Sequence, residues 1–168
     1  MKPISLISLL VVSLCYMSCT KDKVPSQIDE DLFMMAQNSA DFAWYQYNDS
    51  LYERSSGSGH SWPFLKTRYN GIAQTQLDNE GKVLSNASFP ENSMIVKELF
   101  ADSTTIGRYA IMWKQSNHIY ADENGWVWGY INADGTTATS ATHKGNTCIN
   151  CHSQSENIDN TLMNKFFP

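Results

Sequence analysis

Cys148-Ile149-Asn150-Cys151-His152 is the stretch that limits which folds are open to this 168-residue chain. C-x-x-C-H is the attachment pattern of a c-type haem. The two thiols bond to neighbouring vinyl groups of the porphyrin, and the adjacent histidine is held under the iron as an axial ligand. With four Cys and four His in the chain, chance yields this pattern about 0.002 times per sequence. The sequence therefore predicts one covalent haem c bound by Cys148, Cys151 and His152.

Two other interpretations of the paired cysteines stay open. A thioredoxin-like redox pair uses C-x-x-C beside a βαβ unit. A structural zinc ion needs four ligands, usually as two pairs. The sequence contains no second C-x-x-C, so the haem interpretation is favoured over both.

The first residues have the pattern of an export signal. Lys2 precedes an apolar run over 4–12, and Ser18 stands directly before Cys19. A small residue followed by Cys and a polar tail is typical of bacterial lipoprotein processing, in which the cysteine becomes the lipid-modified N-terminus. An ordinary signal peptide or an uncleaved anchor would be the alternatives, but the apolar run is short for a bilayer span. We expect a signal peptide over 1–18.

The cysteines and the charge agree with an exported protein. Cys15 would leave with the signal, Cys19 would carry lipid at the start of a tether over 19–27, and none would remain for a disulfide. The machinery that attaches haem c also works outside the cytoplasmic membrane. The formal charge of −5 becomes −6 without Lys2, and an acidic chain without basic blocks argues against nucleic acid or anionic lipid as partners. We expect a lipoprotein on the periplasmic face of a bacterial membrane or the cell surface.

The remaining residues, 28–168, are enough for one domain. An apolar stripe recurs at three- and four-residue steps from Ile28 to Tyr45 after the candidate N-cap Ser26, which predicts a helix. Beyond it the period changes to two, which predicts strands. The expected strands are 64–70, 94–100, 108–114 and 126–132, with a helical turn within 72–78 and a closing helix over 158–167. The prediction is an α+β fold: an antiparallel β-sheet with an N-terminal helix and a C-terminal c-type haem attachment segment.

The last of these strands has two distinct faces. Trp126, Trp128 and Tyr130 alternate with Val127, Gly129 and Ile131, so the aromatic side chains share one face of the sheet. The five Trp, eight Tyr and seven Phe of the chain suit the lining of a large flat cofactor. They suit an ordinary β-rich core equally well.

In four stretches this sequence resembles the cytochrome P-460 family, which includes the cytochromes c′-beta. The first, 89–99, is similar to the "FP-x-G-x-x-x-VKE" strand of the family. The second is a central hairpin over 110–114 and 124–130. The others are the haem motif and the closing aromatic segment 159–168, while His60, Phe64 and Tyr69-Asn70 look like its upstream strand.

The resemblance implies a five-coordinate haem c on a β-rich scaffold, usually in a homodimer. Some members oxidise hydroxylamine and nitric oxide with a haem cross-linked to a lysine, and others bind nitric oxide or similar gases without the cross-link. Lys97 falls on the position that resembles the cross-linking lysine. No acid matches the distal carboxylate of the catalytic members, because Ala110 and Met112 stand in that region.

The neighbours of Lys97 bear on this role. On a strand, Lys97 points to the same side as Ile95 and Leu99, so its amine must be buried, paired or extended to water. Burial would lower its pKa and make the amine more nucleophilic, as a bond to the porphyrin edge requires. An ion pair is the alternative. Glu98 points the other way, and the expected partners of Glu98 are Arg108 or Lys114.

The sequence offers several candidates for the distal face of the iron. Three histidines could reach it, but each has loop-like neighbours that favour the surface: His60, His118 and His143. Four aromatic residues are candidates for the pocket wall or for ordinary core: Phe64, Tyr69, Trp113 and Trp126.

Three functions therefore compete. The first is a haem protein that binds or scavenges nitric oxide, ranked marginally ahead because the distal acid is absent. The second is an oxidoreductase acting on hydroxylamine or nitric oxide, with a Lys97–haem cross-link and a partner cytochrome as electron acceptor. The third is a membrane-tethered electron-transfer cytochrome with a six-coordinate haem.

Overall fold

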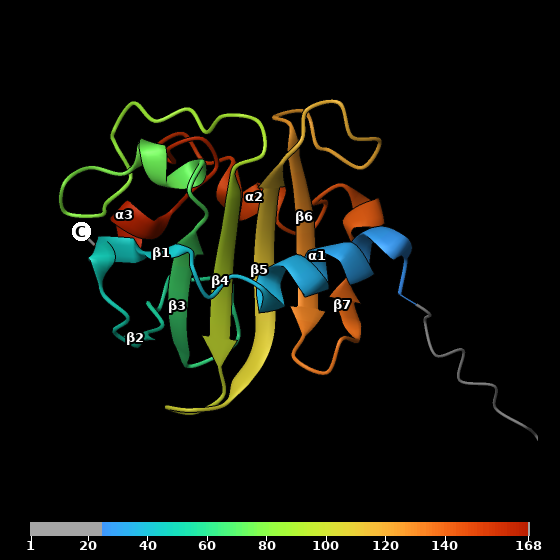
Figure 1. Ribbon diagram of the computed structural model, residues 1–168, viewed down its shortest axis with the longest axis horizontal. Coiled ribbons are helices and arrows are strands. Elements are labelled where there is room, and N and C mark those ends of the chain that lie inside the picture. Colours follow the sequence, from blue (N-terminus) through green and yellow to red (C-terminus); the bar gives the residue numbers. More distant parts are fainter. Residues whose placement is uncertain (1–24, 168) are drawn as a thin grey trace, which may run out of the picture.

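A seven-stranded antiparallel sheet with the order β1-β3-β4-β5-β6-β7, and with β2 also paired to β3, runs through the middle of the molecule (Figure 1). The computed structural model describes residues 25–167, so the expected signal over 1–18, Cys19 and most of the tether over 19–27 lie outside the described residues. The strands are β1 Ala43–Trp44, β2 Tyr52–Glu53, β3 Phe64–Tyr69, β4 Met94–Phe100, β5 Ile106–Lys114, β6 Trp126–Asn132 and β7 Thr137–Thr139. The helices are α1 Gln27–Gln37, α2 Ile149–His152 and α3 Met163–Phe166, with 3-10 turns η1 Tyr45–Tyr47, η2 Ala73–Gln76 and η3 Ala141–His143.

The central strands confirm the prediction from the period-two pattern. Strands β4 and β6 have the predicted bounds, β5 begins two residues earlier than predicted, and β3 ends one residue earlier. All strand pairs are antiparallel. The α+β class, the N-terminal helix and the predicted turn within 72–78 are confirmed as well.

Helix α1 packs across one face of the sheet, as Figure 1 shows. Leu32 is fully buried at the centre of this contact. A Cβ on Gly129 would lie 2.9 Å from Leu32 Cδ1, so glycine at this position of β6 lets the helix approach the sheet closely. The buried side chains of this face are Ile28, Leu32, Ala36, Met94, Val96, Tyr109, Ile111, Val127, Ile131 and Ala141.

Helix α1 is shorter than the apolar stripe from 28 to 45 predicted. It begins after Ser26, as expected, but ends at Gln37, and the Ser39 hydroxyl then donates a hydrogen bond to the Ala36 carbonyl at 2.6 Å. The stripe continues into β1, where Ala43 and Trp44 pair with β3. Pairing with the edge of the sheet, a non-local interaction, overrides the helical periodicity there.

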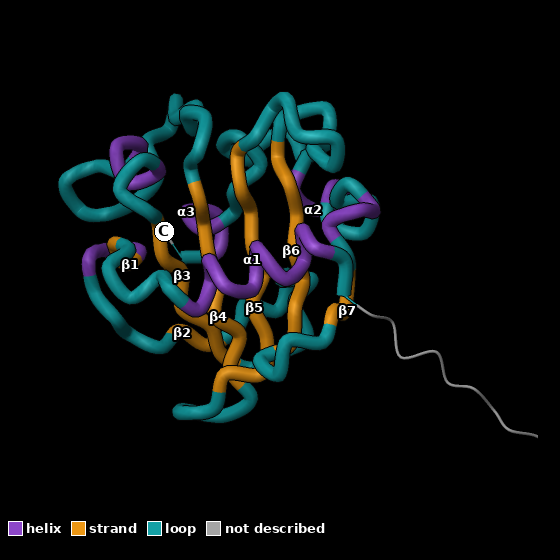
Figure 2. The backbone as a smooth tube through the Cα atoms, turned by 45° about the vertical axis from the view of Figure 1, so that its right-hand side comes forward, coloured by secondary structure: helices purple, strands orange, loops and turns teal. Residues whose placement is uncertain are grey.

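The opposite face of the sheet is covered by the C-terminal segment, with α2 and α3 lying behind the strands (Figure 1). The predicted closing helix over 158–167 is wrong in length, because only Met163–Phe166 is helical. Figure 2 shows the resulting order, with α1 on one side of the sheet and the short C-terminal helices on the other. Among residues 25–167, no helix combines the length and the apolar character needed to cross a membrane.

Truncation of Leu32 should destabilise the fold far more than truncation of its neighbour Met34. We expect Leu32→Ala to lower the free energy of unfolding by about 2–5 kcal/mol, because it leaves a cavity between α1 and the sheet. Met34 is 52% exposed, so Met34→Ala should change it by less than about 0.5 kcal/mol. Urea denaturation of both variants measures this, and equal losses would contradict the packing described.

Candidate haem site

Two rows of residues across four strands form the floor of a pocket on the face opposite α1. The first row pairs Thr67 with Lys97, Lys97 with Ala110, and Ala110 with Tyr130. The second row joins Tyr69, Ile95, Met112 and Trp128 in the same way. All eight side chains line the pocket. Antiparallel register therefore places Lys97 at the centre of this floor.

The haem motif lies directly over these rows. Cys148 caps the short helix α2, whose last residue is His152, and both Cys148 and Cys151 are free thiols. Gly145 precedes them with φ +68°, and a Cβ there would lie 2.3 Å from Trp128 Cδ1. Only glycine therefore lets the chain turn this close to β6 and deliver Cys148 to the pocket.

The structure weakens both alternative interpretations of the motif. A thioredoxin-like pair belongs to a parallel βαβ unit, whereas every strand pair here is antiparallel. A structural zinc ion needs four ligands, and residues 25–167 hold no cluster of three or more His, Cys, Asp or Glu side chains around one point.

His152 is oriented as an axial ligand should be. Its Nδ1 lies 2.7 Å from the Asn160 carbonyl oxygen, which can only accept, so Nδ1 carries the proton. The ring stands edge-on to Trp128, with centroids 4.8 Å apart. Burial lowers the pKa of His152 to about 4, so the imidazole is neutral at pH 7. Nε2 then offers its lone pair to the pocket, and a carbonyl partner on the other nitrogen is the usual support of a ligating histidine.

Asp159 fixes the carbonyl that His152 uses. Asp159 and Asn160 have φ values of +40° and +67°, a left-handed turn that points the Asn160 carbonyl at the imidazole. The Asp159 carboxylate accepts hydrogen bonds from Lys114 Nζ at 3.0 Å, Trp126 Nε1 at 3.2 Å and the Phe89 backbone N–H at 2.7 Å. The turn is therefore tied to the sheet.

Lys97 lies in the pocket, as the strand pattern predicts. No salt bridge or hydrogen bond joins its amine to another side chain within residues 25–167. Burial lowers the pKa of Lys97 to about 8, so a substantial fraction of the amine is neutral at mildly alkaline pH.

The expected partners of Glu98 were wrong. Glu98 pairs with Arg68 at 2.9 Å on the α1 side of the sheet. Arg108 and Lys114 have the same parity on β5 as Ala110, so their side chains project toward the pocket side. Lys114 pairs there with Asp159, and Arg108 lies over the Tyr130 ring.

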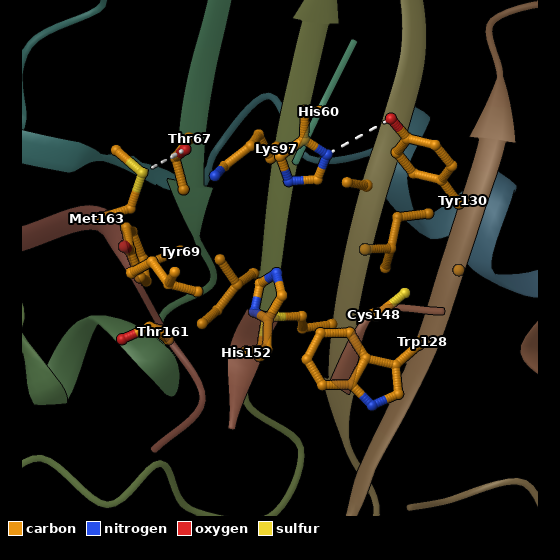
Figure 3. A pocket seen from close by; sticks show the side chains of 16 residues that line it. His60, Thr67, Tyr69, Lys97, Trp128, Tyr130, Cys148, His152, Thr161 and Met163 are labelled. Atoms are coloured by element: carbon orange, nitrogen blue, oxygen red, sulfur yellow. Dashed lines mark hydrogen bonds between the residues drawn. The ribbon is translucent and has the colours of Figure 1, made fainter. Parts of the chain in front are cut away.

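His60 is not a surface residue, contrary to the expectation from its loop-like neighbours. It lines the pocket, and its Nδ1 lies 3.4 Å from Tyr130 Oη. Burial, and then the positive charge of Lys97, lower the pKa of His60 to about 2. Its imidazole is therefore neutral. Figure 3 shows His60 and His152 on opposite sides of the pocket.

The other sequence candidates divide clearly. His143 is exposed, as expected, and His118 packs against Trp113 and Tyr120 away from the pocket. Of the four aromatic residues that were candidates for either the pocket wall or ordinary core, Tyr69 lines the pocket and the other three do not. Trp128 and Tyr130 also line it and were not predicted as wall residues. Trp128 and Tyr130 project from β6 on the same side as Trp126. The cross-strand pairing that aligns this side of β6 with Lys97 was the signal that could have identified them.

The pocket has a volume and a lining compatible with a bound cofactor. A cavity of about 330 Å³ opens between loop 57–61 and the motif, within the roughly 300–1,000 Å³ range of cofactor sites. A smaller hollow of about 50 Å³ adjoins it at the sheet. Neither hollow is lined by Asp or Glu among residues 25–167. Tyr69 Oη is buried there without a hydrogen-bond partner in the same residues. Two thiols at the rim and a free imidazole nitrogen inside fit the thioether and axial bonds of haem c.

The fold and this site define a mono-haem c-type cytochrome built on an antiparallel sheet. The family model for cytochrome P460 matches residues 64–162, from β3 to the segment after the motif. This match covers more than half of the chain, so the protein belongs to the cytochrome P460 family. A search of curated proteins gives no match.

The cost of burying Lys97 should appear as a pH dependence of stability in protein prepared without haem. Between about pH 8, the native pKa, and 10.5, the ordinary one, the unfolded state binds more protons, so raising the pH stabilises the native state. At pH 7, Lys97→Met should be more stable than wild type by about 3 kcal/mol, and the difference should vanish toward pH 11. Urea denaturation across this range measures it, and a difference independent of pH would contradict the prediction.

Proposed function

We propose that this cytochrome binds nitric oxide, or a similar small gaseous ligand, on the face of the haem opposite His152. The observation that carries the proposal is the pocket beside the free nitrogen of His152, whose lining includes no carboxylate from residues 25–167. Its floor is mainly apolar, and the small side chain of Ala110 lies in the middle of one row. Without a carboxylate among the described lining residues to accept protons from a substrate, binding is favoured over proton-coupled oxidation.

The residues around the pocket would have separate roles in the proposed function. Haem c would supply an iron centre that binds diatomic gases. Cys148 and Cys151 would anchor the porphyrin, while Asn160 holds the His152 tautomer that presents Nε2 to the metal. Ile95, Met112 and Trp128 exclude bulk water from the sheet side. The N-terminal pattern supports placement of the protein outside the cytoplasm, attached to a membrane through lipid on Cys19. The homodimer implied by the resemblance stays a prediction.

Filling the space beside Lys97 should weaken gas binding. We expect the haem-loaded wild type to bind one nitric oxide per haem, and Ala110→Leu to lower the affinity roughly tenfold or more, because an added isobutyl group overpacks the pocket. Ala138→Leu is the matched control, since Ala138 is exposed on β7. Anaerobic optical titration with nitric oxide measures the affinities.

Two results would contradict the proposal. One is a wild-type spectrum that does not respond to excess nitric oxide. The other is equal affinity for the Ala110→Leu and wild-type proteins, which would place the ligand outside this pocket.

The position of Lys97 supports a second candidate function, oxidation of hydroxylamine or nitric oxide by a haem that is cross-linked to this lysine. The amine lies in the pocket without a salt-bridge partner in residues 25–167, and its pKa is lowered, so a nucleophilic neutral form is accessible. A partner cytochrome would accept the electrons. The lining without a carboxylate makes this the second choice.

Tryptic mapping distinguishes a cross-linked Lys97 from a free one. A cross-link blocks cleavage after Lys97, so haem absorbance would elute with segment 83–108 joined to segment 145–165. A free Lys97 gives haem on segment 145–165 alone and a separate 98–108 peptide. Lys97→Arg is the control, because it keeps the cleavage site and the charge but removes the amine. Haem on 145–165 alone in the wild type would exclude the cross-link.

A further inference from the structure

Two imidazoles face each other across the pocket. The rings of His60 and His152 have centroids 6.4 Å apart and planes at 76° (Figure 3). They come from distant parts of the chain, His60 from the loop before β3 and His152 from the end of α2. Among the residues described, His118 and His143 do not line the pocket.

This spacing is the one that a single metal ion between two histidines requires. An imidazole nitrogen binds a metal at about 2 Å, which places the ring centre about 3.2 Å from the metal, so two opposed rings have centres about 6.3 Å apart. A histidine that only contacts a bound diatomic ligand must stand back by roughly two more ångströms to leave room for the ligand. The observed 6.4 Å agrees with direct ligation.

Both rings use Nδ1 for their hydrogen bond, which leaves Nε2 of each ring on the pocket side. His152 uses Nδ1 on the Asn160 carbonyl, and His60 has Nδ1 at 3.4 Å from the Tyr130 hydroxyl. Within residues 25–167, Nε2 of neither ring has a hydrogen-bond partner. A proton on Nδ1 of His60 leaves the Nε2 lone pair directed into the pocket, as on a ligating histidine.

The loop that carries His60 has fixed ends and a tip of small residues. Arg54 N–H donates to the Pro63 carbonyl at 2.7 Å, and β2 pairs with β3 just outside this bond. Between them lies Ser55-Ser56-Gly57-Ser58-Gly59, in which the two glycines and three small polar residues allow rearrangement without loss of core. The tip lies against the motif, because a Cβ on Gly59 would be 3.7 Å from Cys151 Sγ.

We infer that His60 is the second axial ligand of the haem iron in the ligand-free protein, and that loop 54–63 must withdraw it before a gas binds. The identity of the entering ligand rests on the proposed function, whereas the ligation of His60 does not. His60 lies four residues before the segment that matches the family, 64–162. The resting haem is then six-coordinate, in place of the five-coordinate haem implied by the resemblance, and His60 leaves the iron before a gas binds.

The coordination state of the haem-loaded protein tests the ligation directly. We expect low-spin optical and electron paramagnetic resonance spectra for the wild type and a high-spin spectrum for His60→Ala. Addition of imidazole to His60→Ala should restore the low-spin state, which shows that the variant is folded and lacks only the ring. His118→Ala is the matched control, because His118 packs on Trp113 outside the pocket, and its spectrum should equal that of wild type.

The rate of carbon monoxide binding to the reduced protein tests the withdrawal. In the wild type the observed rate should level off at high carbon monoxide, at the rate with which His60 leaves the iron. In His60→Ala it should rise linearly. A ligand that occupies the iron in nine of ten molecules lowers gas affinity about tenfold, so His60→Ala should bind at least that much more tightly.

The possible failures are distinguishable. A high-spin wild type, or a low-spin state that persists in His60→Ala, overturns the inference, and gas titration of the same samples still tests the proposed function. A low-spin wild type that becomes high-spin in His60→Ala, yet binds neither carbon monoxide nor nitric oxide in any variant, supports the ligation and contradicts gas binding. A linear rate in the wild type overturns the withdrawal step.

Discussion

The carboxylate of Asp159 is the constraint on which the site depends. It joins Lys114, the Trp126 indole and the Phe89 backbone N–H, so the segment after the haem motif is held on the sheet. The left-handed turn at Asp159 and Asn160 then offers a carbonyl to His152. That carbonyl fixes which imidazole nitrogen of His152 faces the pocket. The hydrogen bonds of Asp159, about seven residues beyond the histidine, therefore control which nitrogen of His152 is free to bind a metal.

The sheet carries an apolar cluster on each face, and the haem pocket lies on one face only. One face carries α1 on a continuous apolar cluster centred on Leu32. The other face holds the two cross-strand rows beside a second apolar cluster, and Ala110 lies between Lys97 and Tyr130 in one of these rows. Since side chains alternate along each strand, changes in one face need not disturb the other. Side chains of the pocket can therefore change without altering the contacts that α1 makes on the other face.

Much of this fold is visible in local patterns. Period-two alternation predicted β4, β5 and β6, and the same alternation placed Lys97 beside Ile95 on one face. The errors lie where partners are distant in sequence. The apolar stripe beyond Gln37 enters β1 because β3 offers a free edge. Glu98 meets Arg68 rather than a residue of β5 because strand parity, not proximity, decides the face.

The sequence by itself indicated the cofactor, because the whole C-x-x-C-H pattern lies within five consecutive residues, Cys148 to His152. It also determined the family and the central strands. Only the tertiary structure decided what stands across from His152. A loop of serines and glycines carries no periodic signal that could place His60, and its position follows from the pairing of β2 with β3 and from the Tyr130 hydroxyl. The distance between His60 and His152 depends on the packing of residues that are far apart in the sequence, and local sequence does not encode it.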